Sequence, residues 1–134
     1  MNGIYHVSKK TADETIRHLS NNETVFVTIV NGEKIKVFSE YMEYIEEKLH
    51  FPRKCDGNTD RYNDWMRDLS WLPYDEYAFF ILNEGVFLKD DPKGRILFTD
   101  TFQNCILPWW ENDVVNHVVG GNRKKMNVYL SGRE

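Results

Sequence analysis

The stretch CDGNTDRYNDWMRD, residues 55–68, contains the clearest helical pattern of the chain. Three of its apolar residues, together with the leucine that follows the stretch, have the spacing i, i+3, i+4 and i+7: Tyr62, Trp65, Met66 and Leu69. This spacing places them on one face of an amphipathic helix. We therefore expect a helix here that packs against a core, and the elements around it are interpreted relative to that helix.

The opposite face of this helix carries a row of aspartates. Asp60, Asp64 and Asp68 recur every four residues and are flanked by Arg61 and Arg67. Like charges one helical turn apart cost about 0.2–0.5 kcal/mol per pair. We expect ion pairs at i, i+3 (Arg61 with Asp64, and Asp64 with Arg67) to offset part of this cost. The carboxylates face either water or a binding partner.

Composition limits the class of protein. The chain has 134 residues, 41% of them hydrophobic, which suits one globular domain. Its net charge of −4 argues against direct binding to a nucleic-acid backbone, which needs a basic surface. No apolar run approaches the roughly 18 residues of a membrane span, and the N-terminus lacks the apolar core of a signal peptide. We expect a cytoplasmic protein, with Cys55 and Cys105 as free thiols.

The first half of the chain indicates alternating strands and helices. We expect a strand over residues 3–7 and a helix that opens with the capping box Thr11–Glu14. The β-branched run TVFVTIV, residues 24–30, predicts a strand buried on both faces and central in a parallel sheet. Asn31-Gly32 follows it and, taken locally, favours a hairpin.

The elements around residues 55–68 have recognisable ends. Ser39 can cap a helix that reaches Leu49 and stops at Pro52. Residues 53–57 form a polar loop, and Asn58 is suited to cap the helix that follows.

The second half contains two strands and a helix. We expect a strand over residues 76–82 beside residues 24–30, a helix over residues 108–119 that ends at Gly120-Gly121, and a last strand over residues 126–130. Residues 86–98 fit either a hairpin or an irregular excursion around Asp90-Asp91-Pro92-Lys93-Gly94.

Catalytic and metal-binding patterns are weak. Asp60 and Asp64 could hold a divalent cation in a hydrolase, but such a site needs further carboxylates, and Arg61 and Arg67 would compete for their oxygens. Cys55 precedes a helix N-terminus, which favours a thiolate, yet local sequence places no histidine beside it. The chain has no zinc-ligand spacing and no phosphate-binding or dinucleotide-binding glycine motif. An aspartate row instead suits a cationic cleft such as nucleases possess.

From Val30 to about Leu82 the sequence resembles the barstar family of ribonuclease inhibitors. The resemblance is carried by Asn31-Gly32-Glu33 at the end of a strand, by the helix that stops at Pro52, and by Asn58-x-Asp60-x-x-x-Asp64. It implies parallel strands with helices packed around them, and it favours strand, turn and helix after Val30 over the hairpin. It also implies that Asp64 is the central phosphate mimic and Asp60 its partner from one turn earlier.

The chain departs from the family pattern at several positions. It has Lys54 and Cys55 where the family tends to have an aromatic residue, and Arg61 and Asn63 where the family has small or apolar ones. For the family's later acidic contact, Glu111 and Asp113 are candidates by location. Residues 1–23 lie outside the resemblance.

We therefore predict an α/β protein with a small sheet of three or four mainly parallel strands flanked by helices. It would be one domain over residues 1–134, with residues 1–23 packed as an extension on a barstar-like core over residues 24–134. The expected function is inhibition of a basic ribonuclease, as a bacterial antitoxin or immunity protein, by a monomer without enzymatic activity or cofactor. Two alternatives stay open: a metal-dependent hydrolase, and a module of the same fold that binds another protein. The expected partner-binding residues are Lys54, Cys55, Asp56, Gly57, Asn58, Asp60, Arg61, Asp64 and Arg67.

Overall fold

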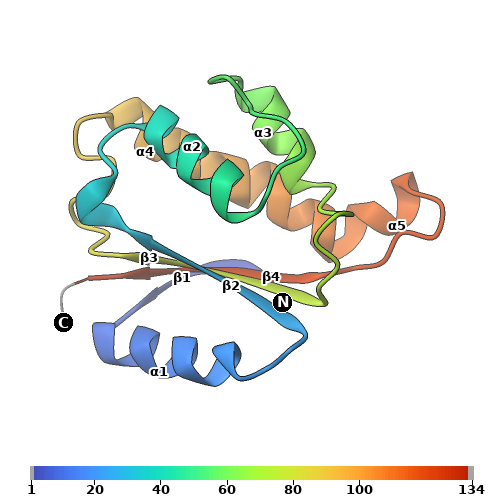
Figure 1. Ribbon diagram of the computed structural model, residues 1–134, viewed down its shortest axis with the longest axis horizontal. Coiled ribbons are helices and arrows are strands. Elements are labelled where there is room, and N and C mark those ends of the chain that lie inside the picture. Colours follow the sequence, from blue (N-terminus) through green and yellow to red (C-terminus); the bar gives the residue numbers. More distant parts are fainter. Residues whose placement is uncertain (1, 133–134) are drawn as a thin grey trace.

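The computed structural model describes residues 2–132, which form a parallel sheet with helices on both faces (Figure 1). The strands lie in the order β1-β4-β3-β2 and pair in parallel throughout. Their bounds are Gly3–Val7 for β1, Val25–Asn31 for β2, Glu76–Leu82 for β3 and Lys125–Ser131 for β4. This α/β architecture, with a four-stranded parallel sheet, confirms the predicted fold class.

The helices are divided unequally between the two faces. Helix α1 (Lys9–Ser20) packs on one face, and the remaining helices lie over the other (Figure 1). That second layer contains α2 (Phe38–Lys48), α3 (Thr59–Met66), α4 (Pro92–Thr101) and α5 (Val114–His117). No helix among residues 2–132 is long and apolar enough to cross a membrane.

Strand β3 occupies the interior position that the sequence had suggested for β2. β2 pairs with β3, as predicted, but no second strand pairs with β2 in the described residues, and Ile29 is 39% exposed. The hydroxyl of Tyr44 donates to the carbonyl of Ile29 at 2.5 Å. The prediction that residues 24–30 form a central strand was wrong. An apolar run indicates that both faces of a strand are covered, but it does not indicate whether another strand lies on each side of it.

Two predicted helix starts were wrong. Ser8, and not Thr11, is the N-cap of α1, and its Oγ accepts the N–H of Thr11 at 3.1 Å. Helix α2 starts one residue before Ser39, with Val37 as N-cap, and the Glu40 carboxylate accepts the N–H groups of Lys36 and Val37. Ser8 thus satisfies a free N–H group in the first turn of α1, whereas Glu40 binds the two N–H groups that precede α2.

Residues 31–34 turn the chain from β2 toward α2 and form no hairpin. Gly32–Lys34 is a short 3₁₀ helix, capped by Asn31, whose Oδ1 accepts the N–H of Glu33 at 3.1 Å. Asn83, just after β3, donates to Asn31 Oδ1 and to Glu33 Oε1, at 3.0 and 3.1 Å. The strand-turn-helix order implied by the family resemblance is confirmed.

The region after β3 is more helical than predicted. Asp91 caps α4 by accepting the N–H of Gly94, and it also accepts the N–H of Phe38. The hydrogen bond from Phe38, and to a smaller extent that from Gly94, holds the pKa of Asp91 below its usual range. Helical structure then continues to His117 through two π-helical segments, Phe102–Ile106 and Trp109–Asp113. The hairpin or excursion over 86–98 and the helix start at Pro108 were therefore wrong. Pro108 lies between the π-helical segments, where regular i→i−4 bonding is already interrupted.

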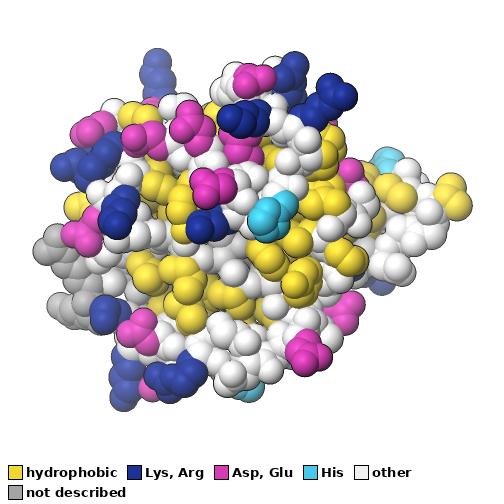
Figure 2. All heavy atoms as spheres, viewed as in Figure 1, with side chains coloured by type: hydrophobic (Ala, Val, Ile, Leu, Met, Phe, Trp, Pro, Cys, Tyr) yellow, Lys and Arg dark blue, Asp and Glu magenta, His cyan; other side chains and the backbone are white. Residues whose placement is uncertain are grey.

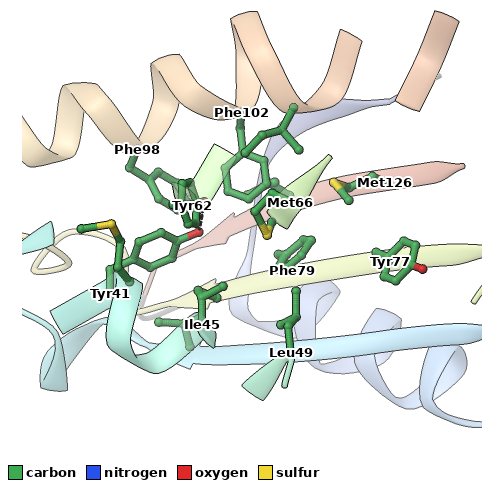
Figure 3. Close-up of a cluster of buried hydrophobic side chains, with 14 of the residues drawn as sticks. Tyr41, Ile45, Leu49, Tyr62, Met66, Tyr77, Phe79, Phe98, Phe102 and Met126 are labelled. Carbon is green, nitrogen blue, oxygen red and sulfur yellow. Dashed lines mark hydrogen bonds between the residues drawn. The ribbon is translucent and has the colours of Figure 1, made fainter. Parts of the chain in front are cut away.

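Two buried tyrosines join α2 to α3 beneath the helical layer. The hydroxyls of Tyr41 and Tyr62 lie 2.7 Å apart, and both side chains are fully buried (Figure 3). Thr101 of α4 is a second polar neighbour of the Tyr62 hydroxyl and partly offsets the effect of burial on its pKa. Burial raises the pKa of both hydroxyls, so they stay protonated.

We expect Tyr62→Phe to destabilise the protein more than Tyr41→Phe. Without the Tyr62 hydroxyl, Tyr41 keeps a buried hydroxyl with no partner, at a cost of about 1–3 kcal/mol. Without the Tyr41 hydroxyl, Tyr62 still has the Thr101 side chain as a polar neighbour, and the cost falls to about 0.5–1.5 kcal/mol. Urea unfolding of both variants and of the double variant measures this. Equal losses that add in the double variant would contradict the assignment.

Candidate partner-binding surface

The loop before α3 is held against α2 by its own backbone. The N–H of Cys55 donates to Glu46 Oε2 at 3.0 Å, and the Cys55 side chain is fully buried. Asp56 and Gly57 then both have positive φ, 51° and 74°, which reverses the chain. Asn58 caps α3, as predicted, because its Oδ1 accepts the N–H of Arg61 at 3.1 Å. The loop and the first turn of α3 thus form one fixed unit.

The buried face of α3 agrees with the sequence pattern. Tyr62 and Met66 are fully buried, and Leu69 is buried just after the helix. Half-buried Trp65 lies at right angles to Trp71, with ring centroids 5.4 Å apart. These contacts fix the rotation of α3, so the opposite face, with Asp60 and Asp64, is exposed.

Asp68 does not belong to the acidic row. Helix α3 ends at Met66, and Asp68 accepts the N–H of Ser70 at 3.3 Å in the turn beyond it. The positive φ of Leu69, 52°, turns the chain away from a helical path. Two aspartates, not three, are therefore presented by the exposed face of α3.

The two arginines pair with different aspartates. Arg67 Nη2 lies 2.9 Å from Asp64 Oδ1, which is the predicted i, i+3 ion pair. Arg61 instead lies 3.4 Å from Asp56 in the loop, so the predicted Arg61–Asp64 pair was wrong. The positive φ at Asp56 brings its carboxylate back beside α3, which i, i+3 spacing does not reveal. Asp60 has no ion pair among the described residues.

Arg67 is also bound from a distant helical segment. Its guanidinium carbon lies 5.6 Å from the ring centre of Trp109, and Trp109 stacks on His117 with centroids 5.8 Å apart. Neighbouring Trp110 is buried, and its Nε1 donates to the carbonyl of Met66 at 2.9 Å. Trp109 and His117 were missed from sequence because they lie more than 40 residues after Arg67.

The charges near the loop are mixed rather than acidic. Between residues 53 and 68 four basic residues match four acidic ones, and Figure 2 shows both signs interspersed over the helical layer. A groove of about 610 Å³ between α2 and the loop is more acidic. Its charged lining residues are Glu43, Glu46, Glu47, Lys54 and Asp56. The glutamates of α2, and not α3, therefore carry the acidic excess beside the loop.

The model of a protein family described as Barstar (barnase inhibitor) matches residues 25–121, which include β2, β3 and all of the helices except α1. The chain belongs to the barstar family. The match includes the loop and the whole of α3, whereas β1, α1 and β4 lie outside the matched residues.

A solved structure of the ORC2 protein of Aeropyrum pernix, in ADPNP–ADP complexes, resembles this barstar-family chain in fold alone. The two share 14% sequence identity with a TM-score of 0.57, and the alignment covers 98% of this chain but 34% of that one. This chain thus spans about a third of the length of that protein. The comparison with curated proteins found no match.

The remaining predicted site residues occupy different positions in this barstar-family structure. Lys54 is exposed beside the groove, whereas the thiol of Cys55 lies in the core, and burial raises its pKa to about 11. Cys55 therefore offers a partner no side-chain surface, and it is poorly suited to act as a nucleophile. Both cysteines are free.

The two later acidic candidates, Glu111 and Asp113, have different surroundings. Glu111 accepts the backbone N–H of Asn2 at 3.2 Å and so faces the N-terminal strand, while Asp113 is exposed. Within residues 2–132 there is no group of three or more His, Cys, Asp or Glu side chains that could hold a metal ion. Among these described residues, Asp60 and Asp64 therefore do not form such a group with a third ligand.

Proposed function

We propose that this protein inhibits a ribonuclease by covering the enzyme's active site with the loop over residues 53–57 and the exposed face of α3. It would act as an antitoxin or immunity protein in the bacterial cytoplasm. The match to the barnase-inhibitor family over residues 25–121 carries this proposal, because it spans the whole of the candidate surface. The exposed Asp60 and Asp64 supply the chemistry.

The mechanism follows from the chemistry of phosphate binding. A ribonuclease holds the RNA phosphate with cationic side chains, and a carboxylate can replace a pair of phosphate oxygens in an arginine fork. The buried face of α3 and the Glu46–Cys55 hydrogen bond fix the loop and helix before binding. This order lowers the conformational entropy lost on association. The net charge of −4 favours encounter with a basic enzyme at low salt.

The proposal is tested by RNA cleavage with a panel of small basic ribonucleases that includes barnase. The protein is expected to abolish cleavage by at least one of them at equal concentration, and association should slow as salt is added. The double variant Asp60→Asn, Asp64→Asn should bind at least about tenfold more weakly, since ~1.4 kcal/mol corresponds to tenfold.

The matched control carries the same change in charge on the other side of the sheet. Asp13→Asn with Glu14→Gln alters two exposed residues of α1 and should inhibit as the unmodified protein does. Full cleavage by every enzyme of the panel in excess protein would contradict the proposal. If a pull-down with this protein from the source cell captures a partner that is not a nuclease, the alternative of a binding module for another protein would be favoured.

A further inference from the structure

The two exposed aspartates of α3 have different surroundings. Asp64 shares its Oδ1 with the guanidinium of Arg67 at 2.9 Å. Asp60, one turn earlier, has no ion-pair partner in residues 2–132, because its neighbour Arg61 is directed to Asp56 at 3.4 Å. In the free protein, therefore, Asp60 is the carboxylate of α3 that is available to an incoming cation.

Arg67 is held in place by contacts from three directions. Its Nη2 binds Asp64, its Nε donates to the carbonyl of Asn63 at 3.3 Å, and its guanidinium lies over the ring of Trp109 at 5.6 Å. Only 34% of the Arg67 side chain is exposed, compared with 71% for Asp64. A guanidinium held by a planar ring and a backbone carbonyl keeps its position better than one held by an exposed carboxylate alone.

This difference decides what a cationic group of a partner meets. A cation that approaches Asp64 also approaches the fixed positive charge of Arg67 and must share a carboxylate that is already paired. A cation that approaches Asp60 meets an unpaired carboxylate at the fixed turn that joins the loop to α3. The two carboxylates are one helical turn apart. A partner with one principal cationic group will therefore favour Asp60, which is unpaired.

We infer that Asp60 is the principal anchor for the partner's cationic group, and that Arg67 withholds Asp64 by keeping it in an internal ion pair. The inference rests on the proposed function and specifies which carboxylate carries it. It reverses the order that the family resemblance implies, in which Asp64 is the central phosphate mimic. The partner's main cation would accordingly dock beside the loop over residues 53–57.

The test is the affinity of single variants for barnase, or for the enzyme of the panel that the unmodified protein inhibits, measured by titration calorimetry. Asp60→Asn should weaken binding by about 30-fold or more, and Asp64→Asn by less than about tenfold. Arg67→Gln should strengthen binding by about threefold or more, because it frees Asp64. Asp68→Asn is the matched control on the same surface and should change affinity by less than about threefold, since an asparagine Oδ1 can still accept the Ser70 N–H.

The outcomes separate this inference from the proposed function. If the unmodified protein binds no enzyme of the panel, the proposed function fails and the inference fails with it. If the protein binds but Asp64→Asn weakens binding more than Asp60→Asn, only the inference is contradicted. Weaker binding by Arg67→Gln would also contradict it, because Arg67 would then position Asp64 for the partner. Thermal unfolding of each variant verifies that the fold is retained.

Discussion

Replacing Gly32 with alanine is expected to destabilise this protein by about 2–4 kcal/mol, although the change adds a single methyl group. A Cβ at Gly32 would lie 2.6 Å from the carbonyl oxygen of Leu82, 2.7 Å from that of Asn83 and 2.9 Å from Phe87 Cβ. Two of these neighbours are backbone atoms at the end of β3 and cannot rotate away. The β2–α2 turn would have to separate from β3.

The measurement is urea unfolding, with Gly85→Ala as the control. Gly85 lies in the turn that follows β3. No atom would lie within 4 Å of a Cβ added there, and its φ is not in the left-handed region. The control should change the free energy of unfolding by less than about 1 kcal/mol. A similar stability for both variants would show that the turn adjusts without cost, and that the glycine of Asn31-Gly32-Glu33 is not required by packing.

Elements with strong local patterns could be predicted from the sequence, but their neighbours could not. The run EYAFFIL gave the bounds of β3 correctly, and Asn58 gave the start of α3. The edge position of β2 was missed because hydrophobicity does not tell a strand covered by helices from one flanked by strands. The helical structure over residues 92–107 was missed because Pro92 and Gly94 are typical of turns, whereas here Pro92 opens α4 and Asp91 caps it.

The candidate surface shows the same limit at the level of side chains. The spacing of Asp64 and Arg67 predicted their ion pair, since both lie on one helix. The Arg61–Asp56 pair depends on a positive φ in the loop, and the contact of Arg67 with Trp109 depends on the packing of a helical segment distant in sequence. These contacts decide which carboxylate is free, and no local pattern encodes them.

Helix α1 is expected to be indispensable for folding, although the family match begins only at Val25. Ala12 is fully buried in a cluster with Val25, Ala78 and Phe80, and Figure 1 shows α1 as the cover of that face of the sheet. Ala12→Asp would place an unpaired charge in this apolar layer. A buried charge without a partner costs about 3–5 kcal/mol, so we expect this variant to unfold cooperatively at a lower melting temperature than the unmodified protein, as measured by calorimetry.

A control on the same helix separates burial from helix propensity. Lys10→Asp also introduces an aspartate into the first turn of α1, but at an exposed position near the helix N-terminus, where a negative charge is favourable. It should therefore leave the melting temperature nearly unchanged.

Removal of residues 1–23 extends the test, because it uncovers Phe80 and also takes β1 away from β4. If that shortened chain unfolds cooperatively with unchanged stability, the sheet does not need α1, and β1 and α1 form an appendage; aggregation would show that they complete the domain.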